Sequence, residues 1–149
     1  MRWRYRISFV LLLWFGAFCQ GQGPKGIGGQ LKVYFTDVEG GQATLFVTPA
    51  GQSLLVDTGW GNNDGRDEER IAEVMKEAAV TRLDYVLITH YHEDHVGGFP
   101  AVLDKIPVGA VIDHGPNREA DPAGEQRYAA YEKAIDAKKL KRLQVKPGD

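Results

Sequence analysis

The residues best suited to chemistry in this 149-residue chain lie together in the segment H-Y-H-E-D-H. Three of its four histidines and one aspartate fall here: His90, His92, Asp94 and His95. Zinc binds neutral imidazole nitrogen and carboxylate oxygen, and a catalytic zinc keeps one coordination position for water. The metal lowers the pKa of that water and supplies a hydroxide nucleophile. These residue types at this spacing predict a metal site rather than a polar loop with exposed histidines.

The spacing also predicts which residues share an ion. Residues two apart in an extended segment point the same way, so His90 and His92 are expected to close on one metal, with Asp94 continuing the alternation. His95 must point elsewhere, which suits a second metal position, and the motif offers Asp94 together with His95 for that second ion. Asp94 is also the candidate catalytic residue, as a base or a group that positions water. The glycines at 97–98 are expected to take backbone angles that a side chain would forbid.

A buried strand must present this cluster. Residues 83–88, L-D-Y-V-L-I, form an apolar, partly β-branched run of that type directly before it. Three earlier strands with short turns are predicted as an antiparallel meander, at residues 31–38, 43–48 and 53–56. A helix at 67–79 should link the meander to the buried strand, with charged residues such as Glu68 facing water. Further helices at 99–105 and 125–140, a strand at 108–112 and the start of another at 143 complete a mixed α/β fold.

The motif H-x-H-x-D-H after a hydrophobic strand resembles the signature of the metallo-β-lactamase fold superfamily. Residues 54–59, L-L-V-D-T-G, resemble that family's first motif. Residues 33–38 and the Gly-rich hairpin after them resemble the competence-protein-like branch, although Gln42 stands where that branch usually has Asp. The resemblance implies half of a four-layer αββα sandwich, an antiparallel meander followed by strand–helix–strand. It also implies a hydrolase that uses one or two Zn²⁺ ions.

Three residues outside the cluster are candidates for the site. Within the family pattern, Asp57 is expected to accept a hydrogen bond from a metal-bound histidine; the alternative is a turn Asp before Gly59. Trp60 is either a wall of the substrate cleft or packing beneath its own loop. His114 is either a substrate contact or an ordinary loop residue.

Residues 1–21 have the pattern of a secretory signal peptide, with arginines at 2, 4 and 6 before an apolar run from Ile7 to Phe18. An uncleaved anchor and lipidation at Cys19 are the alternatives. A Gly-rich leader at 22–30 and a metallo-β-lactamase-like domain at 31–149 follow. The chain is therefore expected to be secreted or periplasmic. Cleavage after Cys19 would remove the only cysteine and exclude disulfides and thiol catalysis.

The charge balance favours a small substrate over a nucleic-acid partner. Without the three signal arginines, 15 basic side chains face 20 acidic ones, so no strong basic excess remains. The expected partner is a small-molecule or phosphodiester substrate, and the membrane is contacted only through the signal segment.

Two functions from different classes follow. The first is an exported hydrolase in which zinc-bound hydroxide attacks an ester, amide or phosphodiester. The second is a non-catalytic or incomplete domain that acts as a binding module. The family draws further metal ligands from a second half of its domain, and no histidine follows His114. We therefore expect a domain truncated at its C-terminus or, alternatively, a half-domain that forms a dimer.

Overall fold

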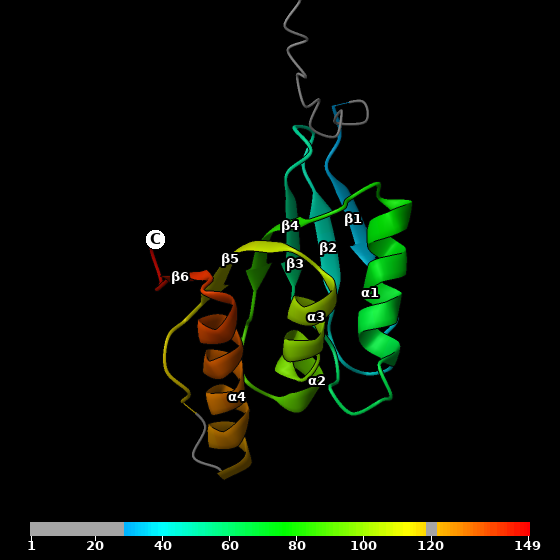
Figure 1. The fold of residues 1–149 in the computed structure, drawn as a ribbon. Helices are drawn as coiled ribbons and strands as arrows, with labels where there is room; N and C mark the ends of the chain where they lie inside the picture. The colour runs from blue at the N-terminus through cyan, green and yellow to red at the C-terminus, as the bar shows by residue number, and fades with distance from the viewer. Residues whose placement is uncertain (1–28, 119–121) are drawn as a thin grey trace, which may run out of the picture.

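The computed structural model describes residues 29–118 and 122–149, and a six-stranded sheet forms its centre (Figure 1). The predicted signal peptide and most of the predicted leader lie outside these residues. The strands are β1 (Lys32–Phe35), β2 (Thr44–Val47), β3 (Ser53–Val56), β4 (Leu83–Leu87), β5 (Val108–Asp113) and β6 (Lys141–Gln144). The helices are α1 (Arg66–Glu77), α2 (Glu93–Val96), α3 (Phe99–Lys105) and α4 (Pro122–Lys138).

The sheet follows chain order from β1 to β6 and changes from antiparallel to parallel at β3. The first three strands form the predicted meander. From β3 onward, helices cross between neighbouring parallel strands, as parallel pairing requires. The predicted mixed α/β fold is confirmed. The bounds differ most at the end of β1, which stops at Phe35 rather than at residue 38, and at the start of α4, which begins at Pro122 rather than at residue 125. The missing N–H of Pro122 is tolerated in a first helical turn. Helices α1 and α4 each end two residues before the predicted bound, and β6 begins two residues early.

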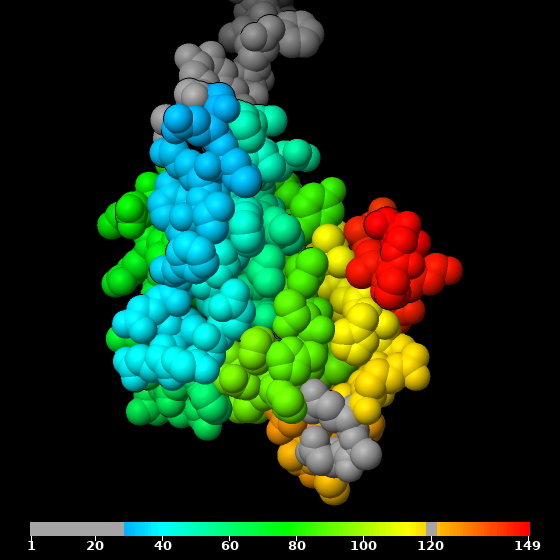
Figure 2. All heavy atoms as spheres, turned by 180° about the vertical axis from the view of Figure 1, so that it is seen from behind, coloured from blue at the N-terminus to red at the C-terminus, as the bar shows by residue number. Residues whose placement is uncertain are grey.

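The helices α1, α3 and α4 cover one face of the sheet (Figure 1). Leu55, Val86 and Val111 are neighbours in the register, point into this layer and are fully buried. From behind, the strands β1 to β5 themselves form the surface (Figure 2). There Phe35 is 81% exposed and Tyr85 is 36% exposed, because alternate residues of a strand point to opposite faces. One helix layer on one sheet corresponds to half of a four-layer sandwich.

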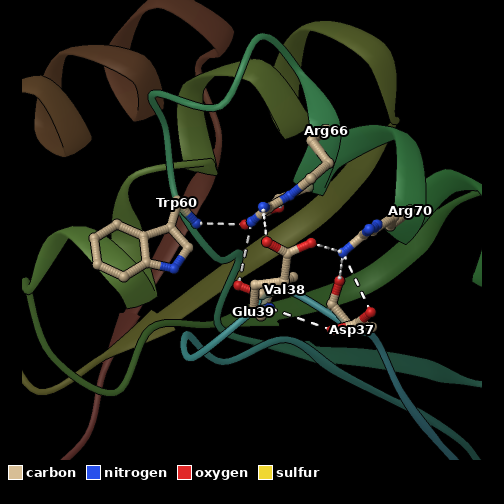
Figure 3. A network of polar contacts seen from close by, with 7 residues as sticks. Asp37, Val38, Glu39, Trp60, Arg66 and Arg70 are labelled. Atoms are coloured by element: carbon tan, nitrogen blue, oxygen red, sulfur yellow. Dashed lines mark hydrogen bonds and ion pairs between the residues drawn. The ribbon is translucent and has the colours of Figure 1, made fainter.

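Helix α1 is tied to the turn between β1 and β2 by two arginines (Figure 3). Arg66 Nη1 donates to Glu39 Oε2 at 2.6 Å, and Arg70 Nη1 donates to Glu39 Oε1 at 3.1 Å. Arg70 also donates to the backbone oxygen of Asp37 at 2.5 Å. Such exposed pairs contribute little stability individually, but together they hold the turn against the start of α1.

Two acidic residues at the start of α1 are buried, so the expectation that Glu68 faces water was wrong. Asp67 is fully buried, and its Oδ2 accepts a hydrogen bond from Trp60 N at 2.8 Å. Glu68 is 7% exposed and lies 3.4 Å from Lys105 Nζ of α3. Helical periodicity could not reveal this burial, because it arises where the loop before α1 folds back over the helix. None of the helices in the described ranges is both long enough and apolar enough to cross a bilayer.

Candidate metal centre

The histidine cluster lies where two neighbouring parallel strands end. Val56 and Leu87 are register partners at the ends of β3 and β4. The chain continues from these strands into Asp57 on one side and Thr89 on the other. The carboxyl ends of parallel strands are where open α/β sheets usually bind ligands. This topology brings two segments, more than thirty residues apart in the sequence, to one edge of the sheet.

The first two histidines follow the predicted alternation. His92 has extended backbone angles, φ −69° and ψ 150°. Tyr91 between them is 1% exposed and donates its hydroxyl to Gly115 O at 2.6 Å. With Tyr91 in the core, the imidazoles of His90 and His92 come together, and His90 Nε2 lies 2.9 Å from His92 Nδ1.

Asp94 does not continue this alternation, and that part of the expectation was wrong. The chain turns at His92 into the one-turn helix α2, where His92 O accepts the backbone N–H groups of His95 and Val96 at 3.0 and 2.9 Å. Asp94 and His95 are therefore neighbours on a helical turn. Asp94 Oδ2 lies 3.5 Å from His95 Nε2.

The donor atoms thus form two close pairs, His90 with His92 and Asp94 with His95. The pairs are adjacent, since the ring centroids of His90 and His95 are 4.0 Å apart. Two nitrogen ligands, or a nitrogen and a carboxylate oxygen, on one tetrahedral zinc lie about 3.3 Å apart, from Zn–N and Zn–O bonds of about 2 Å. Separations of 2.9 and 3.5 Å fit this requirement after shifts of a few tenths of an ångström. Within residues 29–118 and 122–149, however, no three His, Cys, Asp or Glu side chains are grouped so as to hold a metal.

Asp57 lies behind the cluster, at the end of β3. Its side chain is 1% exposed, and its Oδ2 is 2.8 Å from His95 Nδ1. Oδ1 accepts the backbone N–H of Thr89 at 2.8 Å, and Oδ2 accepts the Thr89 hydroxyl at 2.7 Å. The residue has a φ of 58°, a left-handed conformation that Asp tolerates better than most residues. Bonded at Nδ1, His95 presents Nε2 towards Asp94.

Two residues that contact the motif were not identified from the sequence. Thr89 links Asp57 to His90, its Oγ1 lying 3.0 Å from His90 Nδ1. Arg127 of α4 donates from Nε to Tyr91 O at 2.6 Å and so ties α4 to the motif. The threonine directly precedes the first histidine and could have been considered. Nothing in the sequence signals Arg127, which is 36 residues away.

The contacts described for Trp60 and His114 do not involve the three clustered imidazole rings. Trp60 is half-buried, and its indole lies against the turn at Gly41, beside the backbone of Asp94. His114 is exposed, and its ring centroid lies 5.3 Å from that of Tyr91. Their roles in substrate contact stay predictions.

Gly97 and Gly98 are needed for close packing and not for unusual backbone angles, which corrects the expectation. Both have ordinary right-handed angles, with φ of −57° and −73°. A Cβ at Gly98 would overlap Thr58 O, and one at Gly97 would lie 2.5 Å from Gly61 N. The loop after β3 therefore packs directly on the backbone that follows α2.

Gly98→Ala is expected to lower the free energy of unfolding by about 2–3 kcal/mol, because the backbone at Thr58 must move to admit the methyl group. Denaturant titration measures the change. The matched control is Gly40→Ala: a Cβ there meets nothing within 4 Å, and only the φ of 88° causes strain, about 1 kcal/mol. The packing explanation would be contradicted if Gly98→Ala lowered the free energy of unfolding by no more than Gly40→Ala does.

Comparison with known proteins finds a family match and several relatives. The family model described as the metallo-beta-lactamase superfamily matches residues 36–149. The lactamase-like protein notP of Aspergillus sp. is 34% identical over 84 residues, which are 55% of this chain and 25% of that protein. An atrochrysone carboxyl ACP thioesterase of Emericella nidulans is 30% identical over 96 residues, 63% of this chain and 30% of that protein.

A bacterial relative extends the comparison. A hydroxyacylglutathione hydrolase of Synechococcus sp. is 40% identical over 62 residues, 42% of this chain and 24% of that enzyme. The chain thus spans about a quarter to three-tenths of the length of these three relatives. The family match begins after β1 and covers the other two strands of the meander, the histidine motif and everything after it. With the fold described above, it shows that the chain belongs to the metallo-β-lactamase superfamily.

Proposed function

We propose that this chain is the metal-binding part of an exported, zinc-dependent hydrolase. The observation that carries the proposal is the paired arrangement of donor atoms, His90 with His92 and Asp94 with His95, beside the buried carboxylate of Asp57. Catalytic zinc sites use these residue types. Two of the relatives, a thioesterase and a hydroxyacylglutathione hydrolase, support the same reaction class.

Each residue of the proposed site has a distinct role. His90, His92, Asp94 and His95 would hold one or two zinc ions, and a bound zinc would supply a Lewis acid that makes water nucleophilic near neutral pH. Asp94, 28% exposed in its side chain, is accessible enough to orient a water molecule or take its proton. Asp57 holds the ring of His95 in place through Nδ1.

The proposed substrate class is an ester-like acyl bond, with a thioester as the first form to test. The thioesterase among the relatives supports this choice. A phosphodiester is the alternative, supported by the likeness of residues 33–38 to the competence-protein-like branch. An amide is the third class that the same chemistry can attack.

Substitution of the proposed ligands tests the function. We expect His90→Ala and Asp94→Ala each to reduce bound zinc and to lower hydrolysis at least 100-fold, because each breaks one donor pair. Zinc is measured by elemental analysis, and hydrolysis is measured with thioester, ester, amide and phosphodiester substrates. His114→Ala is the matched control for zinc content, since it removes an exposed histidine whose described ring contact is with Tyr91; its activity is not a control, because His114 is itself a candidate substrate contact. The proposal would be refuted if all three variants bound as much zinc as the unaltered chain and hydrolysed the substrates as fast.

The second candidate is a domain that binds metal without turnover. It is favoured by the grouping of the donors in twos, because catalytic zinc usually has three protein ligands. The same experiment separates the two candidates. Zinc that is lost with His90→Ala, together with no hydrolysis of any substrate by the unaltered chain, would support the binding module.

Export and self-association complete the proposal. The arginines and the apolar run within residues 1–21 support export through a signal peptide. The exposed side chains of Val33 and Phe35, which lie two residues apart on the edge strand β1, support pairing with a second copy, since an exposed apolar edge strand is a template for pairing with another chain.

A further inference from the structure

The hydroxyl of Thr89 lies between a carboxylate and an imidazole. Its Oγ1 is 2.7 Å from Asp57 Oδ2 and 3.0 Å from His90 Nδ1. A hydroxyl group has one proton to donate and lone pairs that accept. It can therefore donate to only one of these two neighbours and must accept from the other.

The direction of the bond at Asp57 is fixed by the carboxylate. An ionised carboxylate has no proton and can only accept. The Thr89 hydroxyl must then donate to Asp57 Oδ2, and the remaining contact requires that His90 Nδ1 carries a proton and donates it to Thr89. By the same reasoning His95 Nδ1, 2.8 Å from Asp57 Oδ2, also carries its proton.

We propose that Thr89 is a positioning residue that sets the tautomer of His90, so that Asp57 controls two histidines, His95 directly and His90 through Thr89. Both imidazoles then carry the proton on Nδ1 and present an unprotonated Nε2. A neutral imidazole binds metal only through its unprotonated nitrogen. The tautomer assignment does not depend on the proposed function; only its use in metal binding rests on that function.

The same chain of bonds continues to His92. His90 Nε2, left without a proton, accepts the bond from His92 Nδ1 at 2.9 Å. In the metal-free chain a proton of His92 therefore occupies the direction in which His90 would bind a metal. Metal binding at His90 must break this bond, while the bonds from Thr89 and Asp57 remain.

Nitrogen-15 NMR of the histidine rings in the purified metal-free chain, above the pH at which the rings are protonated, tests the assignment directly. Each ring is assigned through single substitutions. We expect His90 and His95 to carry the proton on Nδ1. A proton on Nε2 of His90 in the unaltered chain would overturn the proposal, and this measurement needs no variant that might fail to fold.

Substitutions then test the role of the hydroxyl. Thr89→Val, which keeps the shape but removes the hydroxyl, is expected to shift His90 away from the Nδ1–H form, while Thr89→Ser keeps it. Thr58→Val is the matched control, because it also removes a hydroxyl bonded to the motif, here to His95 O at 2.9 Å, without touching a ring nitrogen. An unchanged His90 tautomer in Thr89→Val would refute the role of Thr89.

Zinc affinity, measured by chelator competition on the same proteins, separates this inference from the proposed function. We expect Thr89→Val to weaken zinc binding by about 10- to 100-fold, as for other groups that orient metal ligands, and Thr89→Ser to restore most of it. Nδ1–H tautomers in a chain that binds no zinc would refute the function and leave the tautomer assignment standing. Zinc binding by a chain in which His90 carries its proton on Nε2 would refute the tautomer assignment and leave the proposed function standing.

Discussion

Asp57→Asn is expected to weaken zinc binding by about 10- to 100-fold, although Asn has the same shape as Asp and also tolerates the positive φ of this position. Two donors, the Thr89 hydroxyl and His95 Nδ1, approach the same Oδ2 atom. If the amide oxygen keeps the bond to Thr89 N, the amide nitrogen faces both donors and can accept from neither. His95 then loses the bond that orients its ring. Chelator competition with purified protein measures the affinity.

The same substitution is expected to lower the free energy of unfolding by about 2–4 kcal/mol, because two buried bonds to a charged group are lost. Asp37→Asn is the matched control: this carboxylate is 79% exposed in its side chain and pairs with Arg70 at 3.4 Å. We expect the control to change neither stability nor zinc affinity by much. Unchanged zinc affinity in Asp57→Asn would show that Asp57 does not orient a ligand.

Much of the fold could be predicted because its signals are local. The strand at 53–56 and the helix at 99–105 have the predicted bounds, since each is a short apolar run between clear turn residues. The meander needs only alternation and glycines at 40–41 and 51. The resemblance at residues 54–59 and 90–95 supplied the layered architecture, which periodicity alone does not determine.

Prediction from the local sequence pattern failed at the shortest helix, the four-residue α2. Helix α2 is too short for a helical repeat, and E-D-H-V has no apolar periodicity. The extended geometry that is correct for His90 and His92 was therefore carried too far, to Asp94. The glycines at 97–98 were misinterpreted for a similar reason. Their neighbours, Gly61 and Thr58, come from a loop that only the folded chain brings close.

Contacts between distant segments were beyond prediction. Arg127 donates to the motif from 36 residues away. Asp113, one residue beyond the predicted strand at 108–112, is the last residue of β5 and is 1% exposed. Its partner Arg142 lies 29 residues later, in a segment not predicted as strand. A charged residue at a strand end has the same sequence signature whether it is solvated or buried against a partner.

Arg142→Met is expected to lower the free energy of unfolding by about 3–5 kcal/mol, because it leaves a buried carboxylate without its charge partner. The Arg142 guanidinium donates to Asp113 Oδ2 at 2.6 Å and to Oδ1 at 3.2 Å, and the Asp113 side chain is fully buried. Met keeps the volume of the arginine stem, so the loss measures the charge more than the packing. Urea titration followed by circular dichroism gives the free energy.

Tyr131 cannot replace the arginine in this cluster. Burial, followed by its hydrogen bond to Asp113, raises the pKa of Tyr131, so its hydroxyl stays protonated and already donates to Oδ2 at 2.6 Å. Gly115 N supplies the remaining bond, to Oδ1 at 2.7 Å. In Arg142→Met, only these two neutral donors would remain to stabilise the full charge of the buried Asp113 carboxylate. Removing that charge with the double substitution Arg142→Met and Asp113→Asn should therefore recover part of the stability, since an amide oxygen still accepts from Tyr131.

Lys141→Met on the same strand is the matched control, because that side chain is exposed and lies one residue before the arginine. We expect a change within about 0.5 kcal/mol there. The effect of Arg142→Met should also reach the metal motif, since the rings of Tyr131 and Tyr91 lie 5.3 Å apart and Tyr91 separates His90 from His92. Equal stability of the two single variants, or no recovery in the double variant, would mean that the buried charge is stabilised by its neutral donors alone.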